Sequence, residues 1–372
     1  MRAAAGTRAA ASALPARTAR DGAVRILPRF VLQAAPIAVL ASAGVLALRG
    51  SEHRQKSLER GRGRTARSPW QIPLRGWKDI LIRTYREFNE DQLPMIAAGV
   101  SFYSLLAIFP GMAAFVALYG LFAEIGEAQK HLQVLSHFLP ISTLKFIGDQ
   151  MMRLAAAQKG GLSVTFVVGL LTSIWSANGA VTSLITGLNI AYEEHERRSW
   201  VRRTLISLTF TLGLLVFGIA AIAVLSAGPA AEAYVGHHAA MMLNLISWPI
   251  LFVGMGIGLA LLYHYGPSRD PPRFQWVSVG SVAALVLWLV VSALFSLYVG
   301  NFAHYDKTYG SLGAVVGFMI WNWLTNVVIL GGAELNAETE AQTAVDSTSG
   351  ASRPMGLRDA RSADTLGAAQ AR

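Results

Sequence analysis

The chain has 372 residues, of which 53% are hydrophobic and 15% charged, and its mean hydropathy of +0.41 is not that of an ordinary soluble domain. It contains no cysteine, which excludes disulfides, thiolate metal sites and a cysteine nucleophile. The net charge of +10 comes from residues 1–91, which hold 17 Lys or Arg and 7 Asp or Glu, whereas the rest holds 15 of each. Such a segment could bind nucleic acid, but in a membrane protein it favours a cytoplasmic position against anionic lipid.

Residues 1–69 form a basic N-terminal extension. Residues 30–48 are uncharged and flanked by arginine on both sides, so they are either a membrane segment of unclear orientation or part of a targeting sequence. Residues 49–69 are rich in glycine and charge, which predicts a flexible linker.

Residues 77–90 predict an amphipathic helix that can lie in the membrane interface before the first span. Its apolar side consists of Trp77, Ile80, Leu81 and Tyr85, and its basic residues, Lys78, Arg83 and Arg86, are expected elsewhere.

Six uncharged runs follow, at 92–123, 160–192, 204–231, 233–268, 274–305 and 308–333. A spanning helix needs about 20 mostly apolar residues, and one Asp, Lys or Arg at its centre costs about 2.5–3.5 kcal/mol. The sequence therefore predicts an all-α fold, a polytopic membrane helix bundle with six core transmembrane helices over residues 70–340. The segment at 30–48 is a candidate for one further span.

The loop charges predict the orientation of these spans. The loops at 193–203 and 265–275 carry arginines, whereas 227–242 carries no Lys or Arg. The positive-inside rule then places both ends of the core in the cytoplasm. The long outward segment, 123–159, predicts two interfacial helices, and 341–372 predicts a disordered cytoplasmic tail.

The residues offer no catalytic centre, because the histidines are scattered and no metal-ligand spacing or nucleotide-binding loop is present. We expect no enzyme activity, no cofactor and no metal site. Uncharged polar residues remain inside the spans, and they are Ser176, Asn178, Asn322 and Asn326. Because a buried asparagine needs a partner, these residues either bond helix to helix or line a polar cavity for a substrate.

Two further positions are candidate gates. Pro110 and Gly111 interrupt the first span, where proline removes a backbone hydrogen bond and kinks a helix. Glu334 follows the last span at the inner boundary of the bilayer. It is either paired with Arg202 or Arg203, or it acts as an inner gate or proton site.

Lys307 and Tyr309 lie in the short outward loop between the last two spans. Tyrosine rings suit the membrane interface, so the loop is either a well-anchored hairpin or an outer vestibule that contacts an anionic headgroup.

Four sequence blocks carry a family resemblance. They are "GVSFYSLLAIFPGMAAFVALYGLF" at 99–122, "SIWSANGAVTSLITGLNIAYEE" at 173–194, "YHYGPSR" at 263–269 and "NFAHYDKTYGSLGAVVGFMIWNWLTNVVILGGAELNAE" at 301–338. In order and spacing they resemble the YihY/BrkB family of bacterial inner-membrane proteins. The resemblance implies six membrane-spanning helices and an inner-membrane location but supplies no settled activity, since some members carry the label ribonuclease BN and others that of a virulence factor.

The nuclease label fits these residues badly, because a nuclease needs a metal cluster or an acid–base pair. We expect a passive or ion-coupled translocator of a lipid-like or amphipathic substrate. The alternative is a membrane scaffold for envelope assembly that recruits partners through its basic N-terminus and tail, and a tRNA-processing ribonuclease ranks last. The expected partners are membrane lipids, with anionic lipid at the basic segment. We expect no nucleic acid to bind, and the sequence leaves open whether the protein forms a homo-oligomer.

Overall fold

The computed structural model describes residue 59 and residues 61–122, 164–301 and 311–370. The chain divides into two compact units, Met1–Leu58 and Glu59–Arg372, and every described residue belongs to the second. The expected membrane segment at 30–48 and the expected interfacial helices within 123–159 lie outside the described residues.

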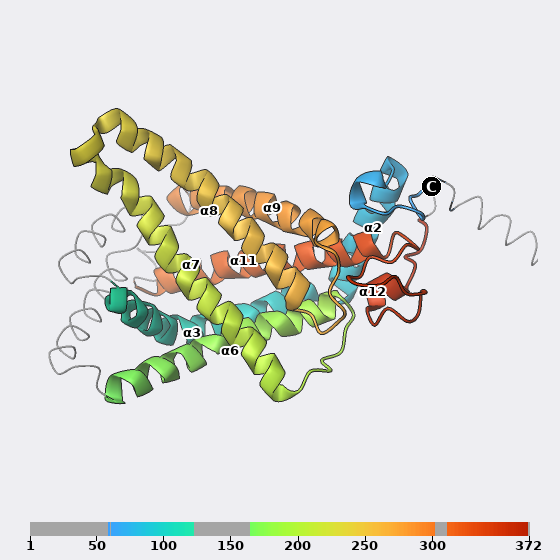
Figure 1. Cartoon of the computed structure of the whole chain (residues 1–372), viewed down its shortest axis with the longest axis horizontal. Coiled ribbons are helices and arrows are strands. Elements are labelled where there is room, and N and C mark those ends of the chain that lie inside the picture. Colours follow the sequence, from blue (N-terminus) through green and yellow to red (C-terminus); the bar gives the residue numbers. More distant parts are fainter. Residues whose placement is uncertain (1–58, 60, 123–163, 302–310, 371–372) are drawn as a thin grey trace, which may run out of the picture. The chain divides into compact units, whose positions relative to one another are not determined.

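The described part of the second unit is all-helical, with eight α-helices, one 3-10 helix and no strand (Figure 1). In chain order the elements are η1 (Pro69–Gln71), α2 (Leu74–Glu90), α3 (Leu93–Phe122), α6 (Val164–Ala191), α7 (Trp200–Val235), α8 (His237–Tyr265), α9 (Phe274–Asn301), α11 (Ser311–Glu340) and α12 (Arg361–Asp364).

Five helices, α6, α7, α8, α9 and α11, are long and apolar enough to cross a membrane. Their candidate spans are Val167–Ala191, Trp200–Ser226, Met241–Tyr265, Phe274–Val299 and Val315–Glu340. The first of the six predicted spans corresponds to α3, a 30-residue helix without a charged residue, in which Leu93–Ala107 forms a shorter apolar stretch. The all-helical membrane fold is thus confirmed, and the sixth span stays a prediction.

The six long helices form a closed ring. In the order α3, α6, α7, α8, α9 and α11 each packs against the next, and α11 returns to α3. The α7–α8 hairpin turns within one residue, because Gly236 adopts a φ of 80°, which glycine tolerates without strain. The predicted outward loop at 227–242 is therefore mostly helical.

The buried apolar core lies at one end of the ring, where α6, α8 and α11 finish and α3, α7 and α9 begin. We call it the charged end; it comprises the α6–α7 loop (192–199), the α8–α9 loop (266–273) and residues 341–370. All six long helices except α7 supply fully buried members, among them Leu93, Leu188, Tyr263, Val277 and Leu330.

Two glycines bring α9 and α11 into backbone contact within this core. A Cβ on Gly280 would lie 2.0 Å from the carbonyl oxygen of Gly332. A Cβ on Gly332 would lie 2.6 Å from the Tyr263 hydroxyl. Small residues permit such close approach between membrane helices.

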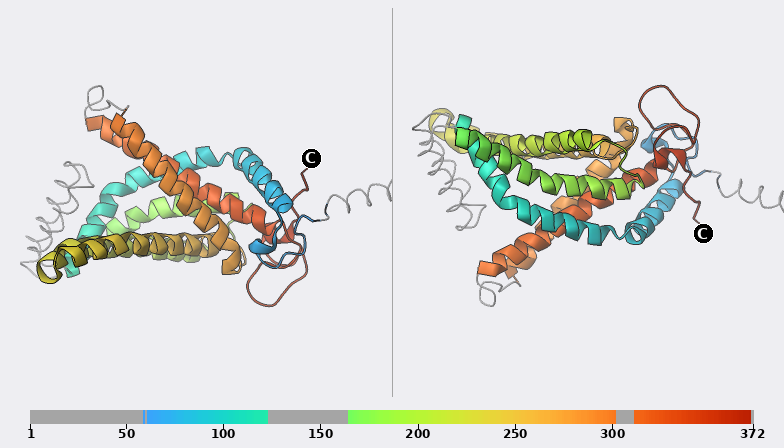
Figure 2. Two further views of the ribbon diagram at one scale, coloured as in Figure 1. Left: turned by 90° about the horizontal axis from the view of Figure 1, so that it is seen from above. Right: turned by 90° about the horizontal axis from the view of Figure 1, so that it is seen from below.

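The helices spread apart away from the charged end. Both views in Figure 2 show α9 and α11 diverging from α7 and α8, with α3 and α6 between them. Near the charged end α8 and α9 are in contact, as where Leu285 packs against Gly256. Farther along, the apolar side chains of these helices are exposed, as at Met242, Leu245, Leu294 and Leu297.

The described residues 341–370, for which the sequence predicts a disordered tail, are folded against the charged end. Ala341, Ala360, Ala363 and Ser347 are buried there. Composition predicted disorder because the segment is polar, yet its polar groups find partners at the helix ends. Ala66, which precedes the boundary predicted at residue 69, packs with Ile80 and Trp276.

Candidate functional site

A pocket of about 140 Å³ opens at the charged end, between α2, the ends of α6 and α11, and α12. Its charged lining consists of Arg83, Arg86, Glu87, Glu193, Glu334, Glu338 and Arg361. Its remaining wall comes largely from the folded C-terminal segment, residues 361–368. The lining thus holds four carboxylates and three guanidinium groups.

Glu334 is the predicted site residue that this pocket contains. It is 3% exposed, and its Oε2 atom accepts no hydrogen bond within the described part of the chain. The expected ion pair with Arg202 or Arg203 is absent from the described contacts. Arg203 instead donates a hydrogen bond to Thr186 at 2.7 Å and lies 3.9 Å from Glu196.

The three arginines of the pocket are each paired with another of its carboxylates. Arg83 binds Glu338 through its Nε and donates to the Gln342 side chain at 2.9 Å. Arg86 lies 3.0 Å from Glu87. Arg361 binds Glu193. Glu334 is therefore the carboxylate of the described lining that no guanidinium neutralises.

Asp91 lies at the junction of α2 and α3, near two of the carboxylates that line the pocket. Its pKa is raised from 3.8 to about 6, first by burial and then by the nearby charges of Glu193, Glu87 and Glu90. Two of these three carboxylates line the pocket.

The loops around the pocket are tied together by Asn189, near the end of α6. Its amide nitrogen donates to Glu196 at 3.1 Å, and its amide oxygen accepts from the backbone of Ser268 at 2.8 Å. Burial opposes ionisation of Glu196, but hydrogen bonds from Arg198 and Asn189 prevail and lower its pKa to about 2. These contacts fix the α6–α7 loop against the α8–α9 loop.

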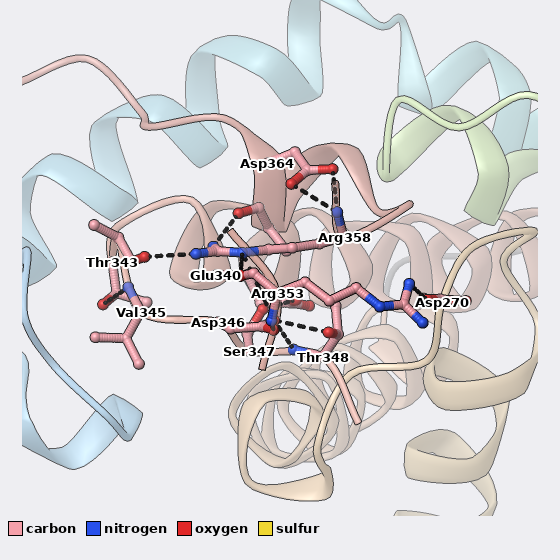
Figure 3. Close-up of polar contacts among 12 residues, drawn as sticks. Asp270, Glu340, Thr343, Val345, Asp346, Ser347, Thr348, Arg353, Arg358 and Asp364 are labelled. Carbon is pink, nitrogen blue, oxygen red and sulfur yellow. Dashed lines mark hydrogen bonds and ion pairs between the residues drawn. The ribbon is translucent and has the colours of Figure 1, made fainter. Parts of the chain in front are cut away.

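The C-terminal segment is held by a second network, drawn in Figure 3. Arg358 donates to the carbonyl of Ala363 at 2.6 Å and to that of Ala344 at 2.7 Å. Asp346 accepts hydrogen bonds from Thr348 and Arg353, which lower its pKa although burial acts in the opposite direction. The wall of the pocket is thus built on a folded scaffold.

The predicted polar cavity residues lie at two separate helix contacts. Asn178 accepts a hydrogen bond from Thr211 at 3.1 Å, which joins α6 to α7. Asn326 donates to the Ser101 hydroxyl at 3.0 Å and Asn322 lies 3.5 Å from the Ser101 carbonyl, which joins α11 to α3. The structure leaves the Ser176 side chain exposed. These contacts match the helix-bonding alternative for the asparagines.

The remaining candidates have different positions. Pro110 lies inside α3, which curves along its length (Figure 2), and Gly111 approaches Ala177 of α6. Lys307 and Tyr309 lie outside the described residues.

Sequence reasoning missed Arg83 and Arg361 as pocket residues. On α2 the buried side holds Asp79, Ile80 and Arg83, whereas Leu81 and Tyr85 of the predicted apolar side are exposed. The four-residue spacing of Asp79 and Arg83 beside Ile80 was the available signal. No sequence signal marked Arg361 as a pocket residue, because its position depends on the fold of the C-terminal segment.

Over the described residues, an all-helical unit with several membrane-length apolar helices defines a polytopic helical membrane protein. Residues 84–355 match the family model of the virulence factor BrkB, so the chain belongs to the BrkB family.

Three bacterial relatives illustrate the family. The "ribonuclease-like" protein YfkH of Bacillus subtilis is 29% identical over 249 residues, which is 65% of this chain and 88% of YfkH. A UPF0761 membrane protein of Pseudoalteromonas atlantica is 25% identical over 277 residues, 72% of this chain and 89% of that protein. The UPF0761 membrane protein ACIAD3168 of Acinetobacter baylyi is 25% identical over 262 residues, 68% of this chain and 61% of that protein. No solved structure matches the chain.

Proposed function

We propose that six helices, α3, α6, α7, α8, α9 and α11, cross the inner membrane of a bacterial cell and that the charged end faces the cytoplasm. The positive-inside bias supports this orientation, because the α6–α7 and α8–α9 loops hold Arg197, Arg198, Arg269 and Arg273. A reporter fused after Arg372 should be active only when it is a cytoplasmic reporter. Activity of a periplasmic reporter at that position would contradict the orientation.

In this orientation α2 lies at the inner surface of the bilayer. Leu74, Leu81 and Tyr85 are exposed on it, beside the exposed Arg75 and Lys78. Apolar residues that enter the acyl region and cations that attract anionic headgroups are the mark of an interfacial helix. Anionic lipid is accordingly the first partner that we propose for this surface and for the basic residues 1–58.

The activity that we propose is translocation of a lipid-like or amphipathic substrate across the membrane. The observation that carries it is the unequal packing of the ring over the described residues: a buried apolar core at the charged end and helices that diverge toward the opposite end (Figure 2). A translocator whose pathway is open to one side of the membrane needs helices that are packed together at one end and spread apart at the other. Pro110 in α3 and Pro249 in α8 add points at which the two helices can bend.

Reconstitution in vesicles tests the proposal. Purified protein should accelerate the movement of a fluorescent phospholipid between leaflets, measured by chemical quenching of the outer leaflet. Asn178→Leu removes the α6–α7 bond and should slow this movement without lowering the amount of inserted protein. Asn89→Leu, the same substitution at an exposed position of α2, is the matched control and should leave the rate unchanged.

Other results would assign the protein to another class. If no lipid or solute moves, and if function in cells survives Asn178→Leu but is lost on removal of residues 1–58, the protein is a scaffold. Metal-dependent cleavage of tRNA by the purified protein, lost on changing one carboxylate, would establish the ribonuclease and refute translocation.

A further inference from the structure

The charged lining of the pocket leaves one carboxyl group without an arginine partner. Arg83, Arg86 and Arg361 are paired with Glu338, Glu87 and Glu193, and Glu334 remains. Glu334 as a whole is 3% exposed, and its Oε2 has no hydrogen-bond donor among the described residues. A buried carboxylate is costly without a partner, so the pocket is suited to a group that brings one positive charge.

The ends of two helices strengthen this preference. α6 ends at Ala191 and α11 at Glu340, and residues from both ends line the pocket. The C-terminal end of a helix carries a partial negative charge, equivalent to about half an elementary charge, and attracts cations. The raised pKa of Asp91 nearby fits the same negative potential.

The size and the donor set narrow the class of cation. A volume of about 140 Å³ exceeds that of a bare ion and would hold several waters. A divalent metal needs about six to eight oxygen ligands, usually from several carboxylates. Among the residues that the structure describes, no group of three His, Cys, Asp or Glu could hold a metal ion. An organic cation with hydrogen-bond donors fits this space better.

We propose that this pocket binds a primary ammonium group, with the charge placed against Glu334. An ammonium has three N–H donors and no acceptor, which matches a carboxylate oxygen that lacks a donor. The ammonium group belongs either to a small soluble amine or to an ethanolamine lipid headgroup, since both present the same chemistry. Binding at this site does not require translocation, so it stands apart from the function proposed above.

The test uses the full-length protein in detergent micelles at constant ionic strength. Its melting temperature is measured against ethylammonium, tetramethylammonium and potassium chlorides, and the affinity for ethylammonium is measured by calorimetry. Ethylammonium should stabilise the protein saturably. Tetramethylammonium, which has the same charge but no N–H, and potassium should not. An equal response to all three salts, or none to ethylammonium, would overturn the proposal with no variant needed.

Variants locate the site. Glu334→Gln should weaken ethylammonium binding about 10- to 100-fold, the range expected for loss of a charge-assisted hydrogen bond. If Glu334→Gln does not fold, Glu334→Asp keeps the charge but shortens the side chain, and it should bind more weakly than the natural chain. Asp359→Asn, at an exposed carboxylate that does not line the pocket, is the control and should bind normally. Unchanged affinity in the Glu334 variants would refute the assignment.

A nanodisc comparison identifies the source of the amine. If a lipid headgroup occupies the pocket, the response to ethylammonium should disappear in nanodiscs of ethanolamine phospholipid and persist in choline phospholipid. If the ligand is a soluble amine, the response should persist in both. Because no transport is measured, failure of this binding test leaves the proposed translocation untouched.

Discussion

Arg269 of the α8–α9 loop and Glu340 at the end of α11 form a fully buried ion pair. Their closest atoms, Nη2 and Oε2, are 2.6 Å apart, and both side chains are 0% exposed. Arg269 also donates to Ser362 at 2.7 Å, and its guanidinium lies 4.9 Å from the centre of the Tyr192 ring. Substituting Arg269→Met keeps much of the volume but leaves the Glu340 charge buried without its partner.

We expect Arg269→Met to cause a large loss of stability, because no ion pair then offsets the desolvation of the buried Glu340 charge. Removing one member of a buried pair costs about 3–5 kcal/mol, whereas an exposed pair contributes about 0–1 kcal/mol. Arg353 and Asp270 provide the comparison, since they are 2.7 Å apart, but their side chains are 51% and 34% exposed. We therefore expect Arg269→Met to destabilise the protein by about 3 kcal/mol more than Arg353→Met.

Chemical unfolding of the detergent-solubilised protein measures this difference. The double variant Arg269→Met/Glu340→Gln removes both charges and should recover part of the loss, which a double-mutant cycle quantifies. If Arg269→Met costs no more than Arg353→Met, the C-terminal segment does not bury this pair and the reasoning is refuted.

Two further predictions concern the same end of the bundle. Gly280→Ala should destabilise the protein by about 1–3 kcal/mol, because its Cβ would overlap the Gly332 carbonyl, whereas Gly258→Ala has open space and should be neutral in the same unfolding assay. Asp91 favours its neutral form in the fold, so its contribution to stability is present below pH 3.8 and is lost as the pH rises through about 6. Asp91→Asn should therefore raise the melting temperature relative to the natural chain at pH 8 but not at pH 4, and an equal effect at both values would contradict the raised pKa of Asp91.

The membrane-length helices and their order were predictable from the sequence alone. Runs without charge over more than 20 residues admit almost no other fold, because the bilayer penalises a charge at the centre of a span. The family resemblance was also recognisable from the sequence alone, since each of its four blocks is a contiguous stretch of the chain. Glu334 was predicted as a site residue because it is a carboxylate at the end of an apolar run.

What surrounds Glu334 was decided by the tertiary structure. Its pocket is completed by Arg83 of α2 and by Arg361 of the C-terminal segment, which are 251 and 27 residues away in sequence. Arg202 and Arg203, the expected partners of Glu334, are arginines like Arg83 and Arg361. No local sequence pattern shows which of these four residues the fold brings close to Glu334. The fold of residues 341–370 was likewise hidden, because its stability comes from long-range hydrogen bonds and ion pairs rather than from its own apolar content. Local hydropathy determines which segments enter the membrane, whereas the pairing of charges at the helix ends depends on which ends the fold brings together.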